Sequence, residues 1–267
     1  MDYEGIVLDV DGTVVRGDEP IDGASEGYRI AAEAGLEPLF VSNNPTKPPA
    51  AYVDRLGSAG FAVDADRVIT AGTVTVEYLK RHHADDELFV IGESGLFKLL
   101  SSAGLSTTES IEDAEVLLAS LDRKFDYEDL SRALWVLEDG IPFLGTDPDV
   151  VIPARERDVP GSGAVINAIA GVAEREPDLV CGKPSDPAID LVTRRIGVAP
   201  EDCLVVGDRL DTDVALGERA GMTTALVTTG VTDEADVADS PYDPDYVLDS
   251  LADIDRILRV DRGPRSG

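Results

Sequence analysis

Two aspartates stand one residue apart directly after a short apolar run near the start of the chain. Residues 5–8 read Gly-Ile-Val-Leu, and Asp9 and Asp11 follow in the sequence DVDGT at 9–13. Carboxylates in this spacing, beside a glycine that allows a tight turn, can present a side chain and a backbone carbonyl to a hard cation. An Asp-Gly turn that merely ends a strand is the plainer alternative. The pattern favours the metal site.

Two further segments carry groups that could contact a phosphate. Ser42 and Asn43 follow an apolar run, and a hydroxyl with adjacent backbone amides suits phosphate oxygens. Lys183 lies between a glycine and a proline at a predicted loop–helix junction, in a chain with only five lysines. Taken alone, the first segment is better explained by ordinary loop chemistry. A surface position is the default for Lys183, and Lys47 is its local rival.

A last acidic segment follows the apolar run at 203–206. Asp208, Asp211 and Asp213 lie within six residues, at the expected end of a strand and start of a helix. Capping and the helix dipole favour acids at a helix N-terminus, which explains Asp211 or Asp213 without any function. They do not explain Asp208, which lies on the strand side of the turn. Asp208 is therefore the stronger candidate for a metal ligand.

The elements that must position these side chains alternate between short β-branched runs and helical patterns. This alternation predicts βαβ units and a parallel sheet, hence an α/β fold with ligands bound at the carboxyl ends of the strands. We expect strands at 6–10, 38–42, 88–91, 116–120, 203–206, 224–227 and 246–248. Helices are expected at 24–34, 49–59, 74–82, 96–103, 127–138, 164–175, 187–196 and 213–220.

Composition narrows the classes of protein. The chain has 267 residues, a net charge of −30 and two cysteines, Cys181 and Cys203, without zinc-type spacing. The acidic charge argues against nucleic-acid binding, and no apolar run is long enough to span a membrane. Attraction of cationic partners and a salt-adapted, halophilic surface both remain open, and the even spread of the acids favours the second. The acidic start is unlike a secretory signal, so a cytoplasmic location is expected.

The four segments occur in a familiar order. DVDGT, then SNNPT at 42–46, then GKPS at 182–185, then GDRLDTD at 207–213 resemble the motifs of haloacid dehalogenase (HAD) superfamily phosphatases. Together with PGSG at 160–163, they are similar to the NagD-like branch, which includes 4-nitrophenylphosphatases and phosphoglycolate phosphatases. The resemblance implies a Rossmann-like parallel-sheet HAD core with an inserted α/β cap domain of the C2 type. Asp147 stands where relatives usually carry Asn, which leaves the cap's substrate contacts open.

The resemblance also implies roles for individual residues. Asp9 would be the nucleophile and a Mg²⁺ ligand, and Asp11 the general acid and base, with its backbone carbonyl on the metal. Asp208 would be the remaining carboxylate ligand. The other positions are Ser42 and Asn43, which would hold the phosphoryl group, Lys183, which would neutralise it, and Asp213, which would support the metal ligands from behind. Asp11 favours phosphate esters over carbon–halogen bonds, because a halide leaving group needs no proton.

The surplus of chain between the second and third segments predicts a second domain. We expect the core at 1–83 and 180–267 and the cap at 84–179. Caps of this kind exclude water and contribute contacts to the substrate. Candidates for such contacts are the segment 122–124 and the loop 146–160, with Arg155 and Arg157, although surface solvation explains any one of them slightly better.

Other classes of protein share parts of this pattern. A receiver-type signalling domain also phosphorylates an aspartate, but it would be about half this length. A catalytically inactive scaffold would not retain every motif residue. A phosphotransferase or mutase on the same fold remains an alternative. The expected partner is a small phosphorylated metabolite, with no nucleic acid and no membrane, and a homodimer is compatible with this interpretation. Phosphoglycolate, nucleotides and sugar phosphates are not distinguished.

Overall fold

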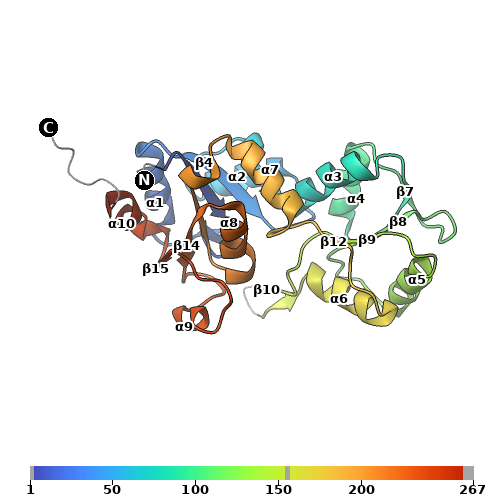
Figure 1. The fold of residues 1–267 in the computed structure, drawn as a ribbon. Helices are drawn as coiled ribbons and strands as arrows, with labels where there is room; N and C mark the ends of the chain where they lie inside the picture. Colours follow the sequence, from blue (N-terminus) through green and yellow to red (C-terminus); the bar gives the residue numbers. More distant parts are fainter. Residues whose placement is uncertain (1–2, 154–156, 261–267) are drawn as a thin grey trace. The chain divides into compact units, whose positions relative to one another are not determined.

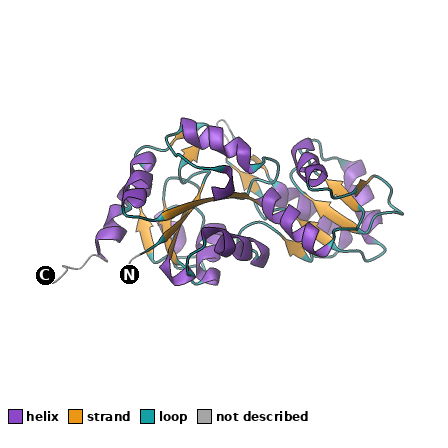
Figure 2. Ribbon diagram, turned by 90° about the horizontal axis from the view of Figure 1, so that it is seen from above, coloured by secondary structure: helices purple, strands orange, loops and turns teal. Residues whose placement is uncertain are grey.

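The computed structural model describes residues 3–153 and 157–260, which form two compact units (Figure 1). The first unit draws its described residues from Met1–Ser42, Pro49–Ile69 and Ile189–Gly267, and the second from Asn43–Pro48 and Thr70–Ala188. The second unit is thus inserted into the sequence of the first. Both units combine a parallel sheet with helices on its faces (Figure 2). Arg155, one of the expected cap residues, lies outside the described residues.

The sheet of the first unit has six strands in the order β15-β14-β13-β1-β4-β5. β1 pairs in parallel with β4 and β13, and β14 does so with β13 and β15. The strands are β1 (Gly5–Asp9), β4 (Glu37–Ser42), β5 (Val68–Thr70), β13 (Cys203–Gly207), β14 (Thr223–Val227) and β15 (Tyr246–Leu248). Every residue of β1 and β13 is buried, which explains their almost uninterrupted apolar sequences.

Helices cover the sheet because alternate strand residues point to opposite faces. Ile6 and Leu8 of β1 pack in one cluster with Leu56 of α2 and Ile254 near the C-terminal helix. The helices of this unit are α1 (Ala24–Glu33), α2 (Pro49–Ser58), α7 (Asp186–Ile196, whose first residues belong to the second unit), α8 (Ala215–Ala220), α9 (Glu234–Val237) and α10 (Asp255–Val260). A short π-helical segment, η3 (Leu210–Val214), precedes α8. The 3-10 segments are η1 (Ala65–Arg67), η2 (Pro200–Asp202) and η4 (Leu251–Asp253).

A small hairpin follows β1. Its strands β2 (Val15–Arg16) and β3 (Glu19–Pro20) are antiparallel, with Arg16 opposite Glu19 and the turn at 17–18 between them. Gly17 at this turn has φ +62°, a left-handed conformation that favours glycine.

The sheet of the second unit has five strands in the order β12-β9-β8-β6-β7, and all of its neighbouring strands pair in parallel. They are β6 (Leu88–Ile91), β7 (Thr107–Thr108), β8 (Val116–Ala119), β9 (Phe143–Gly145) and β12 (Leu179–Val180). The hairpin of β10 (Val151–Ile152) and β11 (Val159–Pro160) lies apart from this sheet in the pairing pattern.

The two faces of the second sheet carry different helices. Val116 and Leu118 of β8 pack with α3 (Ala71–His82) and α4 (Ser94–Ser102), whereas Leu117 and Ala119 pack with α5 (Tyr127–Leu137) and α6 (Ser162–Ala173). α5 begins with a capping box, because the side chain of Asp126 accepts from the amide of Asp129 while Asp129 accepts from that of Asp126.

The predicted α/β fold class is confirmed, and each expected strand and helix is present with its ends shifted by a few residues. The expected helix 213–220 is divided between η3 and α8. The sequence did not predict β5, β7, β9, β12 or the two hairpins, because strands of two or three residues give too little alternation to detect. Cys181 and Cys203 are free and buried. No helix in the described part of the chain is long and apolar enough to cross a membrane.

Candidate active site

Three strands of the first unit end with polar residues at one edge of its sheet. Asp9 is the last residue of β1, Ser42 is the last of β4, and Asp208 comes directly after β13. Because β1 runs parallel to both neighbours, with Asp9 opposite Val41, the three strand ends lie at the same edge. Open α/β sheets bind their ligands at this edge.

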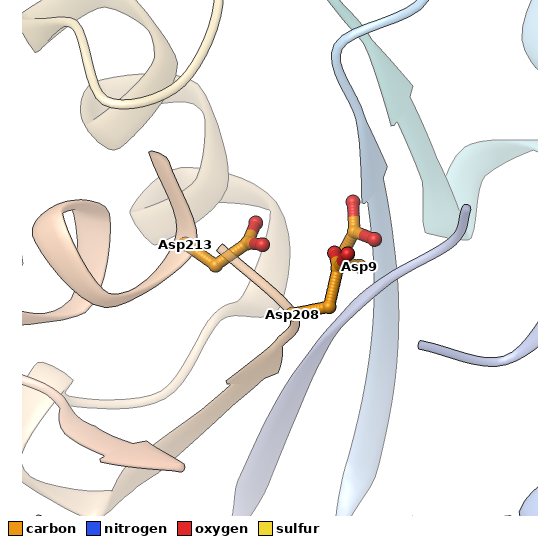
Figure 3. A group of neighbouring side chains, drawn as sticks. All are labelled: Asp9, Asp208 and Asp213. Atoms are coloured by element: carbon orange, nitrogen blue, oxygen red, sulfur yellow. The ribbon is translucent and has the colours of Figure 1, made fainter. Parts of the chain in front are cut away.

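Three carboxylates meet here. Asp9, Asp208 and Asp213 each offer an oxygen, and these oxygens lie within 4.8 Å of one another (Figure 3). All three residues are buried, with exposures of 8%, 1% and 2%. Asp213 comes from η3, so two strand ends and the following helical turn build the group. The sequence had assigned Asp213 a place behind the metal ligands, whereas its carboxylate lies within the group itself.

Backbone amides hold two of these carboxylates in place. The amide of Val231 donates to Asp208 Oδ2 at 2.7 Å, and the amide of Arg209 donates to Asp213 Oδ2 at 3.1 Å. Hydrogen bonds from amides fix the direction of a carboxylate side chain. The two carboxylates are therefore held in fixed positions at the edge of the sheet.

Close approach of the backbone makes glycine necessary around this group. A Cβ atom at Gly12, where φ is +103°, would lie 2.4 Å from Asp208 Oδ2, and one at Gly230 would lie 1.8 Å from the same oxygen. A Cβ at Gly207 would lie 2.2 Å from the Cβ and Cγ atoms of Asp213. Gly12 and Gly207 belong to the segments singled out in the sequence, but Gly230 carries no recognisable signal there.

The group of carboxylates fits a magnesium ion. Buried like charges this close repel each other strongly unless a cation or a proton compensates them. Carboxylate oxygens are the ligands that hard divalent cations prefer. The backbone that packs tightly around Asp208 fixes the position of its carboxylate. Asp9, Asp208 and Asp213 are therefore the residues that could hold the ion.

Asp11 does not belong to the carboxylate group. Its side chain is 53% exposed and forms an ion pair with Arg55 of α2, with 2.5 Å between Arg55 Nη2 and Asp11 Oδ1. Arg55 was not predicted, since a single arginine on a helix has no distinguishing pattern.

The other expected group at this edge, Ser42, is 4% exposed, and its hydroxyl lies 3.0 Å from the hydroxyl of Tyr52, also on α2. Burial raises the pKa of Tyr52, so its phenol stays neutral.

In the second unit, Asn43 and Lys183 lie together. The amide of Lys183 donates to Asn43 Oδ1 at 2.8 Å, and Asn43 Nδ2 donates to Asp149 Oδ1 at 3.3 Å. The side chain of Asn43 thus connects segments that are far apart in the sequence. Lys183 is 4% exposed, so the default surface position is wrong for it, whereas its rival Lys47 is exposed.

A buried acid lies beside this contact. Asp147 is 2% exposed, and a Cβ on Gly182 would lie 2.9 Å from the Cβ of Asp147. Desolvation, and secondarily the charge of Asp149, raise the pKa of Asp147 to about 8. The Thr146 hydroxyl, 3.0 Å from Asp147 Oδ2, opposes this shift only in part. Asp147 is therefore largely protonated at neutral pH.

The remaining cap candidates lie at the surface. Arg123 is exposed and pairs with Glu93 at 2.6 Å, and Lys124 and Arg157 are exposed as well. These positions agree with the solvation alternative, and substrate contact at any of them stays a prediction.

Comparisons with known proteins identify the family. The Haloacid dehalogenase-like hydrolase model matches residues 6–106, and the HAD-hydrolase-like model matches 180–254. The chain is 32% identical to the sugar-phosphatase AraL of Bacillus subtilis over 95% of this chain and 92% of that protein. Among solved structures it is similar to the p-nitrophenyl phosphatase from Archaeoglobus fulgidus, with 35% identity, a TM-score of 0.89 and coverage of 97% and 100%. It is also similar to NagD from E. coli K-12, with 26% identity, a TM-score of 0.83 and coverage of 94% and 98%.

The fold, the order of the motifs and these matches define a class. The chain belongs to the haloacid dehalogenase-like hydrolases and is a phosphatase of that family. Within the family it is NagD-like, as its sequence had indicated. This assignment confirms the predicted enzyme class and sets aside the receiver-type and scaffold alternatives.

Proposed function

We propose that this enzyme hydrolyses small phosphate monoesters with magnesium, through a phosphoaspartyl intermediate on Asp9. The observation that carries the proposal is the position of Asp9. It ends the buried central strand β1, and its carboxylate lies in one group with Asp208 and Asp213. A nucleophile there would meet the phosphorus atom beside the site best suited to a cation.

In the first half-reaction an oxygen of Asp9 would attack phosphorus, and the bond to the ester oxygen would break. Asp11 would give its proton to the departing alkoxide as general acid. Magnesium, held by Asp9, Asp208, Asp213 and the backbone carbonyl of Asp11, would neutralise the phosphoryl charge, which is the main demand of phosphoryl transfer.

In the second half-reaction water would attack the phosphorus of the acyl phosphate. Asp11, now a carboxylate, would take the proton of that water, and the bond between phosphorus and Asp9 would break. Inorganic phosphate leaves, and both aspartates return to their initial states. The chemistry needs one residue that serves as acid and then base, which is the role proposed for Asp11.

Ser42, Asn43 and Lys183 would bind the phosphoryl group. A serine hydroxyl and backbone amides donate to phosphate oxygens, and a lysine adds a compact positive charge. The Asn43 side chain is engaged with Asp149 and with the backbone of Lys183, so its own backbone amide is the better candidate for the phosphate. We propose that the side chain holds the Lys183 segment in place.

The second unit would act as the cap that excludes water and selects the substrate. The division at residues 84 and 179 stays a prediction, since the compact unit also contains α3 and residues 43–48. The name of AraL points to sugar phosphates as the first substrates to test. Nucleotides and phosphoglycolate remain alternatives.

Phosphate release with and without magnesium, from a panel of phosphate esters, tests the proposal together with Asp9→Asn. We expect turnover to fall by about 10⁴-fold or more, as when other covalent enzymes lose their nucleophile. Rapid acid quench and mass spectrometry should find a phosphate adduct on the peptide that contains Asp9 in the wild type only. The exposed Asp139→Asn is the matched control. Substantial turnover by Asp9→Asn would exclude the covalent mechanism.

A further inference from the structure

Arg55 is a charged residue that the fold of the first unit holds almost completely out of solvent. Its side chain is only 11% exposed, although it lies in the last turn of α2. Tyr52 is three residues earlier on the same helix, which places both residues on one helical face. The guanidinium carbon lies 5.8 Å from the centre of the Tyr52 ring. An aromatic face at this distance attracts the cation and restricts its movement.

The polar edge of the guanidinium contacts two neighbouring segments. One is Asp11, which receives hydrogen bonds at 2.5 Å from Nη2 to Oδ1 and at 3.4 Å from Nη1 to Oδ2. The other is the turn of the β2–β3 hairpin, where Nε donates to the carbonyl of Gly17 at 2.9 Å and lies 3.7 Å from Asp18 Oδ1. Nη2 also donates to the Gly17 carbonyl.

These contacts fix the direction in which Asp11 points. A guanidinium that is itself held by Tyr52 and Gly17 presents a rigid planar fork, and a carboxylate bound to both prongs has little freedom to rotate. An exposed aspartate without such a contact would sample several rotamers. Arg55 thus links the rigid helix α2 to a side chain that is 53% exposed.

We propose that Arg55 is a positioning residue for Asp11, which it holds in the orientation that proton transfer requires. The inference rests on the proposed function, in which Asp11 is the general acid and base. Misplacing a catalytic group by about 1 Å can cost about 10²-fold in rate. Removal of the Arg55 guanidinium should therefore slow only the steps in which Asp11 transfers a proton.

Two esters separate this role from a purely structural one. In Arg55→Ala, hydrolysis of a simple alkyl phosphate should slow by about 10- to 100-fold, because both half-reactions need Asp11. With 4-nitrophenyl phosphate, whose leaving group needs little protonation, the first half-reaction should stay within about three-fold of the wild type. A burst of nitrophenol near one equivalent per enzyme should then precede a slower steady state.

A double-mutant cycle tests whether Arg55 acts through Asp11. In the Asp11→Asn background, Arg55→Ala should slow the alkyl ester by less than about two-fold further, because the group that it positions is already gone. Arg55→Lys keeps the charge without the planar fork, so its loss on the alkyl ester should be smaller than that of Arg55→Ala. Tyr52→Phe keeps the ring beneath Arg55, and its ratio of rates on the two esters should equal that of the wild type.

Arg29→Ala is the matched control, because Arg29 forms ion pairs with Glu26 and Glu33 on an exposed face of α1. It should leave both esters unchanged. Equal slowing of both esters by Arg55→Ala, additive losses in the cycle, faster turnover, or misfolding of both Arg55 variants would each overturn the proposal. If Asp9→Asn or Asp11→Asn stays active, the proposed function itself fails. If both variants lose activity as expected, but the losses from Arg55→Ala and Asp11→Asn are additive, only the positioning role of Arg55 is refuted.

Discussion

Each unit of the molecule buries carboxyl groups close together, and the two units differ in what accompanies the charge. In the first, Asp9, Asp208 and Asp213 bring their oxygens within 4.8 Å of one another. In the second, Asp147 lies buried beside the half-buried Asp149, and its pKa is raised to about 8. The first arrangement suits a cation, and the second suits a proton.

The neighbours of each group explain the difference. Backbone amides donate to Asp208 and Asp213 and fix the positions of their carboxylates within the group. Asp147 also accepts hydrogen bonds, from the Asp149 amide at 3.3 Å and from the Thr146 hydroxyl, but desolvation outweighs them and raises its pKa. Burial alone therefore does not identify a metal site, because Asp147 is buried as deeply as Asp208 and Asp213 but lies outside their group.

The largest expected difference between the two groups of acids is in how magnesium changes the stability of the protein. At about 100 times its dissociation constant the ion should add about 2.7 kcal/mol to the stability of the wild type, or about 5–10 °C in Tm. Asp208→Asn should lose most of this rise, whereas Asp147→Asn should retain it. Thermal unfolding with and without magnesium, at fixed ionic strength, measures both. An equal rise in all three proteins would place the ion elsewhere.

The pH dependence of stability should reveal the proton on Asp147. The native state holds this proton up to about pH 8, whereas the unfolded chain releases it near pH 4. Between these values the native state binds more protons, so this group's contribution to stability falls as pH rises. Asp147→Asn removes the effect, and its stability relative to the wild type should increase by at least about 1.4 kcal/mol from pH 5 to pH 8.5, the equivalent of one pKa unit.

Urea unfolding of both proteins at the two pH values provides the measurement. The exposed Asp139→Asn is the control, and its difference from the wild type should change little with pH. A difference for Asp147→Asn that is the same at pH 5 and pH 8.5 would contradict a protonated Asp147.

Salt should act on a third set of acids, those at the surface. At a net charge of −30, repulsion opposes folding, and the screening length falls from about 10 Å at 0.1 M salt to about 3 Å at 1 M. Potassium chloride should therefore raise the Tm of the wild type by about 2 °C or more between these concentrations, equivalent to roughly 0.5–1 kcal/mol. A constant Tm would count against salt adaptation.

The same titration sharpens the comparison, because salt screens exposed charges, whereas a buried carboxyl that carries a proton has no charge to screen. The difference in stability between Asp147→Asn and the wild type should therefore stay constant as salt is added. A difference that disappears in molar salt would mean that Asp147 behaves as a surface charge.

Local sequence predicted the parts of this protein that depend on neighbouring residues. An apolar run followed by Asp9 marks β1, and a similar run before Asp208 marks β13, because a strand buried on both faces must be apolar along its length. Parallel pairing then requires these strand ends to share an edge. The α/β class followed from the same patterns, and the surplus of chain between the second and third motifs indicated a second domain.

The tertiary structure alone decided which distant residues meet. Gly230 packs against Asp208, Arg55 pairs with Asp11, and the side chain of Asn43 binds the backbone of Lys183, 140 residues away. It also placed Asp213 within the carboxylate group and buried Asp147. Such contacts depend on how helices and loops pack onto finished sheets. Sequence periodicity records only which face of an element is buried, so it contains no information about the partner that covers that face.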